Sequence, residues 1–227
     1  MIPNLSMTVL TDGRKHYIEK ALPTWIDAYG DLIKDKAIID DSGDPDYRLW
    51  LRNTFSDFTI IPVDTDRQGH AVGMRKVFST VMDMGKPFNL HTEDDFVLHS
   101  PPDLAGIMDL MQDFHDLSQL SFMRQPWYPN EIEHGGVVEA LEADNPDAAF
   151  RQRYHNDTPW VIHRAYWTCN PSVFPSWVAK RNWPAPPWSE AWFSKALMRE
   201  KVSGIWGTRD NWVVTEHIGR DRNGTQY

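Results

Sequence analysis

Short apolar runs alternate with amphipathic helical segments over the first 98 residues of the chain. We predict strands at residues 5–10, 36–40, 58–63 and 87–91. Before the last of these runs, a helix predicted at residues 69–84 places Met74, Phe78, Val81 and Met82 on one side. This alternation of strand and helix predicts an α/β fold, in which helices flank a mainly parallel central sheet.

The pattern is less regular after residue 98. Ser100 is the predicted N-cap of one helix, and Ser189 that of another, which runs to about residue 199. Further elements are a short helix at residues 171–180 and strands at residues 160–168, 202–206 and 212–217. Polar residues dominate residues 125–159, which we interpret as a substrate-facing insertion or loop with one candidate short helix near residues 137–141.

The composition excludes some broad classes. With 23 Lys and Arg against 32 Asp and Glu, the net charge is −9, which argues against a general nucleic-acid binder. Cys169 is the single cysteine, so an intramolecular disulfide is impossible. No signal peptide is visible and no run approaches the roughly 20 apolar residues of a membrane span. We therefore expect a cytoplasmic protein with no membrane span.

Three consecutive carboxylates, Glu93-Asp94-Asp95, follow the apolar run at residues 87–91. Unit charges about 4 Å apart repel by roughly 4 kcal/mol at an effective dielectric near 20, so such a triplet needs solvent or a cation. Ligands bind at the carboxyl ends of strands in open α/β sheets, and Mg²⁺ or Mn²⁺ prefers carboxylate oxygens together with phosphates. The triplet is either a divalent-metal site or a solvated acidic turn.

Two earlier strand ends carry polar residues as well. Asp40 and Asp41 follow the second predicted strand, and their carboxylates could accept hydrogen bonds from a ribose or a base. Thr11, Asp12 and Arg14 follow the first strand in a short loop that could receive a nucleotide. Each segment taken alone is equally compatible with an ordinary turn.

The last third of the chain adds three candidates. His217 ends an apolar run and could offer a neutral imidazole to a metal ion. Arg220 and Arg222 could bind a diphosphate, and Glu190, at the start of a predicted helix, could deprotonate an acceptor hydroxyl. A surface histidine with a basic tail, and a helix-dipole charge at Glu190, are the plainer interpretations.

In their order along the chain, these segments resemble the GT-A glycosyltransferases, in particular the family-2-like group. The matching positions are Thr11 to Arg14, Asp40-Asp41, the helix from Gly69, the Asp-x-Asp type motif at Glu93-Asp94-Asp95, Glu190 and His217. Glu93 departs from the motif, which begins with Asp. The resemblance implies a single GT-A-like domain over residues 1–227, with a nucleotide-sugar donor half at about 1–98. An acceptor half and a C-terminal lid would occupy about 99–227.

The resemblance also implies an activity: transfer of a sugar, with inversion, from a UDP- or GDP-type nucleotide diphosphate donor to an acceptor hydroxyl. Asp95 and His217, with Glu93, would hold Mn²⁺ or Mg²⁺, and Glu190 would be the general base. Arg75, Arg220 or Arg222 would add positive charge at the diphosphate. Thr11, Asp12, Arg14, Asp40 and Asp41 would hold the nucleoside, with Glu93 and Asp94 near the ribose.

Other functions fit parts of the same pattern. A nucleotidyltransferase that makes a nucleotide sugar could share the acidic site, although the loop at residues 11–14 is short for its phosphate loop. A non-catalytic carbohydrate-binding protein could use some of the 11 Trp and 7 Tyr as sugar platforms. A glycoside hydrolase would need only two carboxylates.

Overall fold

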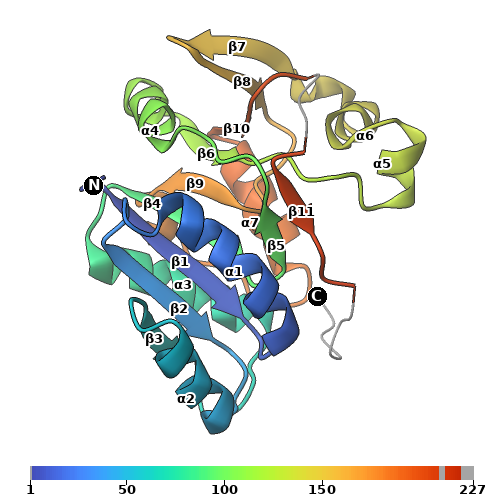
Figure 1. Ribbon diagram of the computed structural model, residues 1–227. Helices are drawn as coiled ribbons and strands as arrows, with labels where there is room; N and C mark the ends of the chain where they lie inside the picture. The colour runs from blue at the N-terminus through green and yellow to red at the C-terminus, as the bar shows by residue number, and fades with distance from the viewer. Residues whose placement is uncertain (1, 210–212, 221–227) are drawn as a thin grey trace.

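The computed structural model describes residues 2–209 and 213–220. Its parallel part contains four strands and the helices that connect them (Figure 1). The strands are β1 (Leu5–Thr11), β2 (Asp35–Asp40), β3 (Thr59–Pro62) and β4 (Phe88–Glu93). The helices are α1 (Lys15–Tyr29), α2 (Pro45–Thr54) and α3 (His70–Met84).

The second half of the chain extends this sheet with mixed strand directions. In the described residues the sheet has nine strands in the order β3-β2-β1-β4-β9-β6-β10-β8-β7. The added strands are β6 (Leu117–Ser121), β7 (Arg151–His155), β8 (Thr158–His163), β9 (Ser172–Pro175) and β10 (Val202–Trp206). β9 is antiparallel to both β4 and β6, whereas β6 and β10 are parallel to each other.

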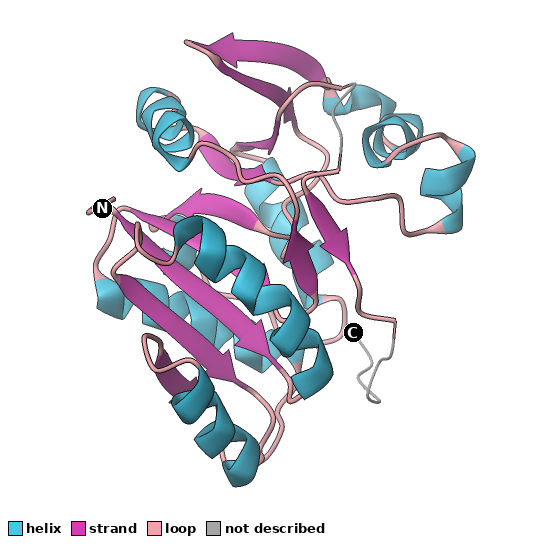
Figure 2. Cartoon of the chain, in the orientation of Figure 1, coloured by secondary structure: helices cyan, strands magenta, loops and turns pink. Residues whose placement is uncertain are grey.

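Helices and a small second sheet complete the fold (Figure 2). The helices are α4 (Leu104–Asp113), α5 (Pro129–Glu133), α6 (Val137–Asp144) and α7 (Ser189–Met198), with 3₁₀ turns η1 (Pro146–Ala148) and η2 (Val178–Lys180). β5 (Phe96–Leu98) pairs antiparallel with β11 (Thr215–His217). This pairing brings the C-terminal segment next to the end of β4.

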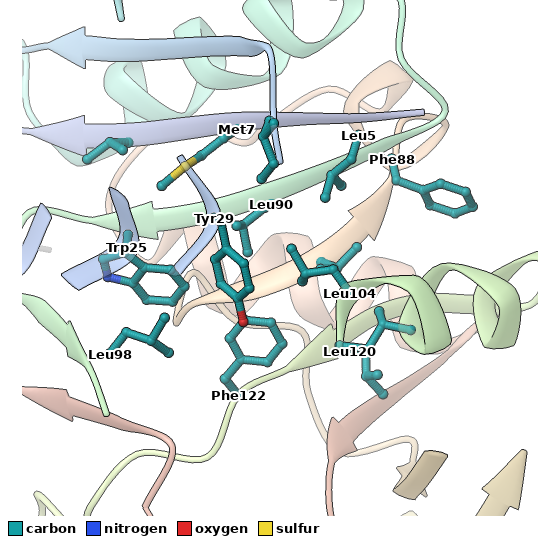
Figure 3. Close-up of a cluster of buried hydrophobic side chains, with 14 of the residues drawn as sticks. Leu5, Met7, Trp25, Tyr29, Phe88, Leu90, Leu98, Leu104, Leu120 and Phe122 are labelled. Atoms are coloured by element: carbon teal, nitrogen blue, oxygen red, sulfur yellow. The ribbon is translucent and has the colours of Figure 1, made fainter. Parts of the chain in front are cut away.

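Both faces of the sheet are covered by apolar cores, and the alternation of side chains along the strands explains why. Leu5 and Met7 of β1 pack on one face with residues of α1 and α4 (Figure 3), and Val9 belongs to the same cluster. Leu10 points to the other face, under α3. There a Cβ on Gly73 would lie only 2.9 Å from the Leu10 side chain, so glycine allows the helix to approach the strand closely.

The structure confirms the predicted fold class, an α/β fold with helices on both faces of a large sheet. The parallel half was predicted nearly strand for strand, and β4 runs two residues further than expected, to Glu93. Of the predicted later elements, α7, β10 and the C-terminal strand, shortened to β11, are present. None of the helices in the described ranges has the length and apolar character that crossing a bilayer requires.

Several local predictions are wrong. The helix expected at residues 171–180 is β9 followed by η2, because the four residues of β9 are fully buried between β4 and β6. Asp103, not Ser100, caps α4 by accepting the backbone N–H of Ala105. No side-chain cap precedes α7, where Trp188 occupies the N-cap position in place of Ser189.

Two regions contain more regular structure than the sequence predicted. Asp44 and Pro45 begin helix α2, with the Asp44 carboxylate accepting backbone N–H groups at the first turn. Residues 125–159 form α5, η1 and β7 in place of a loop, and α6 confirms the short helix expected near residues 137–141. The strand predicted at residues 160–168 begins earlier and ends at His163.

Candidate functional site

The ends of β1, β2 and β4 bring the predicted donor-side residues to one edge of the sheet. Thr11 is paired in register with Asp40, and Leu10 with Glu93, so the residues that follow each strand share that edge. The Thr11 hydroxyl donates a hydrogen bond of 2.7 Å to Asp94. The acidic segments seen in the sequence are therefore neighbours in space.

Arg14 lies at the centre of this edge and binds three carboxylates. Its Nη2 is 2.7 Å from Asp94 Oδ1, its Nη1 is 2.9 Å from Asp95 Oδ2, and its Nε is 2.7 Å from Asp12 Oδ1. Burial raises the pKa of Asp94 well above its usual range, despite the opposing charge of Arg14. The guanidinium group thus neutralises part of the negative charge for which the sequence predicted a metal ion.

Asp95 meets His217 on the other side of Arg14. The Nε2 atom of His217 lies 3.3 Å from Asp95 Oδ2. Burial alone would raise the pKa of Asp95, but the hydrogen bond with His217 and the charge of Arg14 hold it below its usual value. The other oxygen, Asp95 Oδ1, is buried without a hydrogen-bond partner among the described residues.

The donor set formed by Asp95 and His217 fits a divalent cation. A carboxylate and an imidazole 3.3 Å apart have the spacing of two neighbouring ligands of one ion, since each ligand lies about 2 Å from Mg²⁺. The unpartnered Asp95 Oδ1 would offer such an ion a further oxygen. The backbone at Gly219 packs closely against this pair, because a Cβ there would lie 2.0 Å from Asp95 Oδ2 and 3.0 Å from His217 Nε2.

The His217 side chain is held in place from several sides. Its ring stacks on Phe96 at a centroid distance of 4.7 Å and contacts Trp127 at 4.3 Å. The side-chain amide of Gln125 accepts a hydrogen bond from the backbone N–H of His217 and donates one to the backbone carbonyl of His217, both at 2.8 Å. The imidazole is therefore oriented before any ligand binds.

Glu93 does not join Asp95 and His217, contrary to the predicted metal set. Its Oε1 lies 2.9 Å from His70 Nε2, at the start of α3. Among the described residues, three potential metal ligands approach within 4.8 Å of one another only at His70, Glu93 and Cys169. Burial acts to lower the pKa of His70, but the hydrogen bond and charge of Glu93 raise it overall.

Two adjoining cavities lie at this edge of the sheet, and His70 and Glu93 line both. The larger has a volume of about 370 Å³, within the usual range for small-molecule sites, and reaches His217, Glu190 and Trp188. The smaller, about 40 Å³, lies among the loop residues of the donor edge. Its lining residues are Leu10, Thr11, Asp12, Arg14, Asp41, Arg67, His70, Glu93 and Asp94.

Glu190 lines the larger cavity from the first turn of α7, as its predicted position requires. Its Oε1 accepts the backbone N–H of Cys169 at 2.8 Å, which fixes the carboxylate. Cys169 itself is buried, and burial raises the pKa of its thiol well above the usual range. A carboxylate held at a cavity wall in this way can accept a proton from a bound hydroxyl.

The Asp41 side chain lines the smaller cavity and also makes hydrogen bonds within the protein. Its carboxylate accepts the backbone N–H groups of Gln68 and Gly69, which hold the loop before α3. Burial raises the pKa of Asp41 in spite of these hydrogen bonds. Asp40 is fully buried, is bound by Arg48 at 2.8 Å and lines neither cavity.

Arg75 and Arg220, two of the other predicted arginines, line neither cavity. Arg75 donates a hydrogen bond to the Trp183 carbonyl at 3.2 Å. Arg220 is exposed, and Arg222 lies outside the described residues.

Two residues of the site were not predicted from the sequence. One is Arg67, which pairs with Asp12 at 2.5 Å and lines the smaller cavity, and the other is His70. The position of His70 directly after Gly69, at a helix start next to the donor edge, is the signal that could have found it.

Comparisons with known proteins identify the fold. No protein-family model matches the chain, and no curated protein does. Solved structures similar to it include S. aureus TarS 1–349 (12% identity, TM-score 0.61) and the same protein in complex with UDP-GlcNAc (14%, 0.59). These matches cover 95% and 98% of this chain but only 60% of the TarS chains. A longer S. aureus TarS structure matches with a TM-score of 0.58 at 13% identity, and 36% of it is covered. TarS is a GT-A-type, family-2-like glycosyltransferase. This chain therefore has the GT-A-type glycosyltransferase fold that its motifs resembled.

Proposed function

We propose that the protein is a metal-dependent glycosyltransferase that moves a sugar from a nucleotide diphosphate donor to an acceptor hydroxyl with inversion. The observation that carries this proposal is the convergence of Asp95, His217 and Glu190 from distant parts of the chain. Asp95 and His217 face each other at 3.3 Å, and His217 and Glu190 line one cavity. The cytoplasmic location stays a prediction from the sequence.

The donor would bind along the edge that joins the two cavities. Thr11, Asp12 and Asp41 surround the smaller cavity and offer hydrogen-bonding groups to a nucleoside. Arg67 pairs with Asp12 and lines the same cavity, so its guanidinium would add positive charge near the phosphate oxygens of the donor. The TarS structure with UDP-GlcNAc supports a UDP-type donor.

Asp95 and His217 would hold the divalent cation, Mn²⁺ or Mg²⁺. When bound, the ion neutralises the charge that develops on the departing nucleotide diphosphate. Arg14 touches Asp95 and supplies permanent positive charge at the same edge. Arg220 and Arg222 would add positive charge at the diphosphate when the C-terminal segment closes over the donor.

Glu190 would act as the general base. The acceptor hydroxyl oxygen forms a bond to the anomeric carbon while the bond from that carbon to the diphosphate oxygen breaks. The hydroxyl proton passes to Glu190, and the electron pair leaves with the nucleotide diphosphate. One direct displacement inverts the configuration at the anomeric carbon. The hydrogen bond from the Cys169 N–H keeps the Glu190 carboxylate at the cavity wall.

The test is an assay of nucleotide diphosphate release. The purified chain is incubated with a panel of UDP- and GDP-sugars, with Mn²⁺, with Mg²⁺ or with a chelator. Release that depends on the ion, together with a sugar product of inverted configuration, supports the proposal. Pyrophosphate formed from a nucleoside triphosphate and a sugar 1-phosphate would show a nucleotidyltransferase instead. Absence of nucleotide binding under all these conditions would refute both activities.

A further inference from the structure

Trp188 occupies a position that is unfavourable for the fold in two respects. Its side chain is 66% exposed, and its backbone has φ 63° and ψ 30°, in the left-handed region. Large side chains rarely adopt this backbone conformation, which glycine accepts without strain. The indole also lines the larger cavity, two residues before Glu190. An exposed, strained tryptophan at the wall of a cavity points to a binding role.

Tyr128 provides a second aromatic wall of the same cavity. It is 49% exposed, and the segment that carries it is fixed by the carboxylate of Glu131. Glu131 Oε2 accepts the backbone N–H groups of Trp127 at 2.6 Å and of Tyr128 at 3.0 Å. The guanidinium of Arg124 lies 5.6 Å from the Tyr128 ring centroid. The aromatic wall is thus held in place by buried polar contacts.

The charges around this cavity disfavour an anionic ligand. Arg124 is the one Lys or Arg among the described residues that line it, and Glu131 binds both of its terminal nitrogens, at 2.8 and 2.7 Å. Glu93 and Glu190 line the cavity as carboxylates. Away from His70 and from the cation proposed at His217, a phosphate or carboxylate on the ligand would therefore meet carboxylates and a guanidinium already paired with Glu131.

We propose that the larger cavity is the acceptor subsite and that the acceptor is a neutral carbohydrate. A pyranose ring has an apolar C–H face that packs on an aromatic ring, and hydroxyl groups at its edge that reach polar side chains. With one sugar face on Trp188, a hydroxyl can reach Glu190 and give it its proton as the new glycosidic bond forms. Tyr128 borders the same sugar ring or the next sugar of the glycan. This inference rests on the proposed function, because it names the acceptor of that reaction.

The chain offers matched controls for both aromatic residues. Trp188→Gly removes the indole at a backbone position that suits glycine, so folding should not suffer. Trp192 is 57% exposed on the same helix but does not line the cavity, which makes Trp192→Ala its control. Tyr154, 68% exposed on β7, serves in the same way, with Tyr154→Ala as the control for Tyr128→Ala.

Two measurements test the inference. The labelled protein, without nucleotide, is applied to an array of neutral and anionic glycans. Acceptor-dependent release of UDP from UDP-sugars is then measured with the glycans that bind, with nucleic acid and with protein. We expect neutral glycans to bind and to stimulate release. Trp188→Gly and Tyr128→Ala should raise the acceptor KM at least tenfold, with affinity for UDP within twofold of the wild type.

The outcomes separate this inference from the proposed function. If UDP is bound and released but an anionic glycan, a nucleic acid or a protein is the best acceptor, the inference is wrong and the function stands. An equal effect of Trp188→Gly and Trp192→Ala would also overturn it. If neutral glycans bind through Trp188 but no nucleotide binds, the proposed function fails and a glycan-binding site remains. Absence of glycan binding by the wild-type protein overturns the acceptor subsite.

Discussion

The Nε2 atom of His217 lies 3.3 Å from Asp95 Oδ2, although 122 residues separate them in the chain. The pairing of β11 with β5 brings them together, since His217 is in register with Phe96, the residue after Asp95. The candidate metal site is therefore complete only when the C-terminal segment has docked on the end of β4. Ligand binding at this pair should stabilise that docked segment.

Replacing Asp95 by Asn should weaken ion-dependent nucleotide binding. The substitution keeps the shape of the side chain and removes the negative charge that would hold the cation. We expect the affinity for UDP in the presence of Mn²⁺ to fall at least tenfold, and the gain on adding Mn²⁺ to disappear. Isothermal titration calorimetry with Mn²⁺ and with a chelator measures both effects.

Glu216→Gln is the control for this variant. Glu216 precedes His217 on β11 and pairs with His99, and both side chains are about half exposed. Removing its charge should leave UDP affinity with Mn²⁺ unchanged. If Asp95→Asn binds UDP and Mn²⁺ as well as the control does, Asp95 is not a ligand of the ion.

Replacing Glu190 by Gln should separate donor binding from transfer. The backbone N–H of Cys169 lies 2.8 Å from Glu190 Oε1 in the wild type. The glutamine side chain keeps an oxygen that can accept this N–H, but it cannot take the proton of the acceptor. We expect kcat to fall about 10²- to 10⁴-fold, the usual contribution of a general base, with UDP affinity retained. Glu200→Gln, at an exposed ion pair with Arg181 after the same helix, should retain full activity. A fully active Glu190→Gln enzyme would exclude this carboxylate as the base.

Arg14→Ala should destabilise the folded protein strongly. The substitution leaves Asp94 and Asp95 buried without the guanidinium that lies 2.7 and 2.9 Å from them. Breaking a buried ion pair from one side costs about 3 kcal/mol or more. Urea unfolding at pH 7 measures the loss. Lys15→Ala, which removes the next positive charge from an exposed pair with Glu19 and from the Trp50 ring, 4.5 Å from its centroid, should cost about 1 kcal/mol or less.

The parallel half of the fold was predictable because its signals are local. Each strand of that half is a short apolar run followed by a polar loop, and α1 and α3 show helical spacing of apolar residues. β9 was mistaken for part of a helix because its four residues are placed by pairing with β4 and β6, which are distant in sequence. α2 was missed because its cap, Asp44 followed by Pro45, also has the composition of a loop.

The site was predictable at the level of segments, not of side-chain partners. The acidic triplet was correctly expected at a strand end. Its three carboxylates have different partners: Glu93 contacts His70, Asp94 contacts Thr11, and Asp95 contacts His217, while Arg14 binds both Asp94 and Asp95. Local sequence carries no information on these partners, because each comes from a different element. The metal set that joined Glu93 to Asp95 failed for this reason.

Acid should destabilise the fold through His163, a buried histidine away from the candidate site. Its ring stacks between Phe150 and Tyr166, at centroid distances of 4.8 and 4.6 Å, and burial lowers its pKa to about 3. In the unfolded chain the imidazole titrates near its ordinary value of 6.5. Between these values the unfolded state binds more protons, so stability falls as the pH falls, by up to about 1.4 kcal/mol per pH unit.

His163→Phe should remove this part of the acid sensitivity. Phenylalanine keeps the stacking and replaces a ring whose Nε2 is buried without a partner among the described residues, at the cost of a long hydrogen bond from the Ala165 N–H at 3.3 Å. Urea unfolding at pH 7, 6, 5 and 4.5 should show the variant gaining about 1 kcal/mol per pH unit on the wild type below pH 6. The same substitution at exposed His115 is the control, and its stability curve should run parallel to that of the wild type. Parallel curves for His163→Phe and the wild type would mean that His163 binds its proton equally in the folded and unfolded states, and that burial does not shift its pKa.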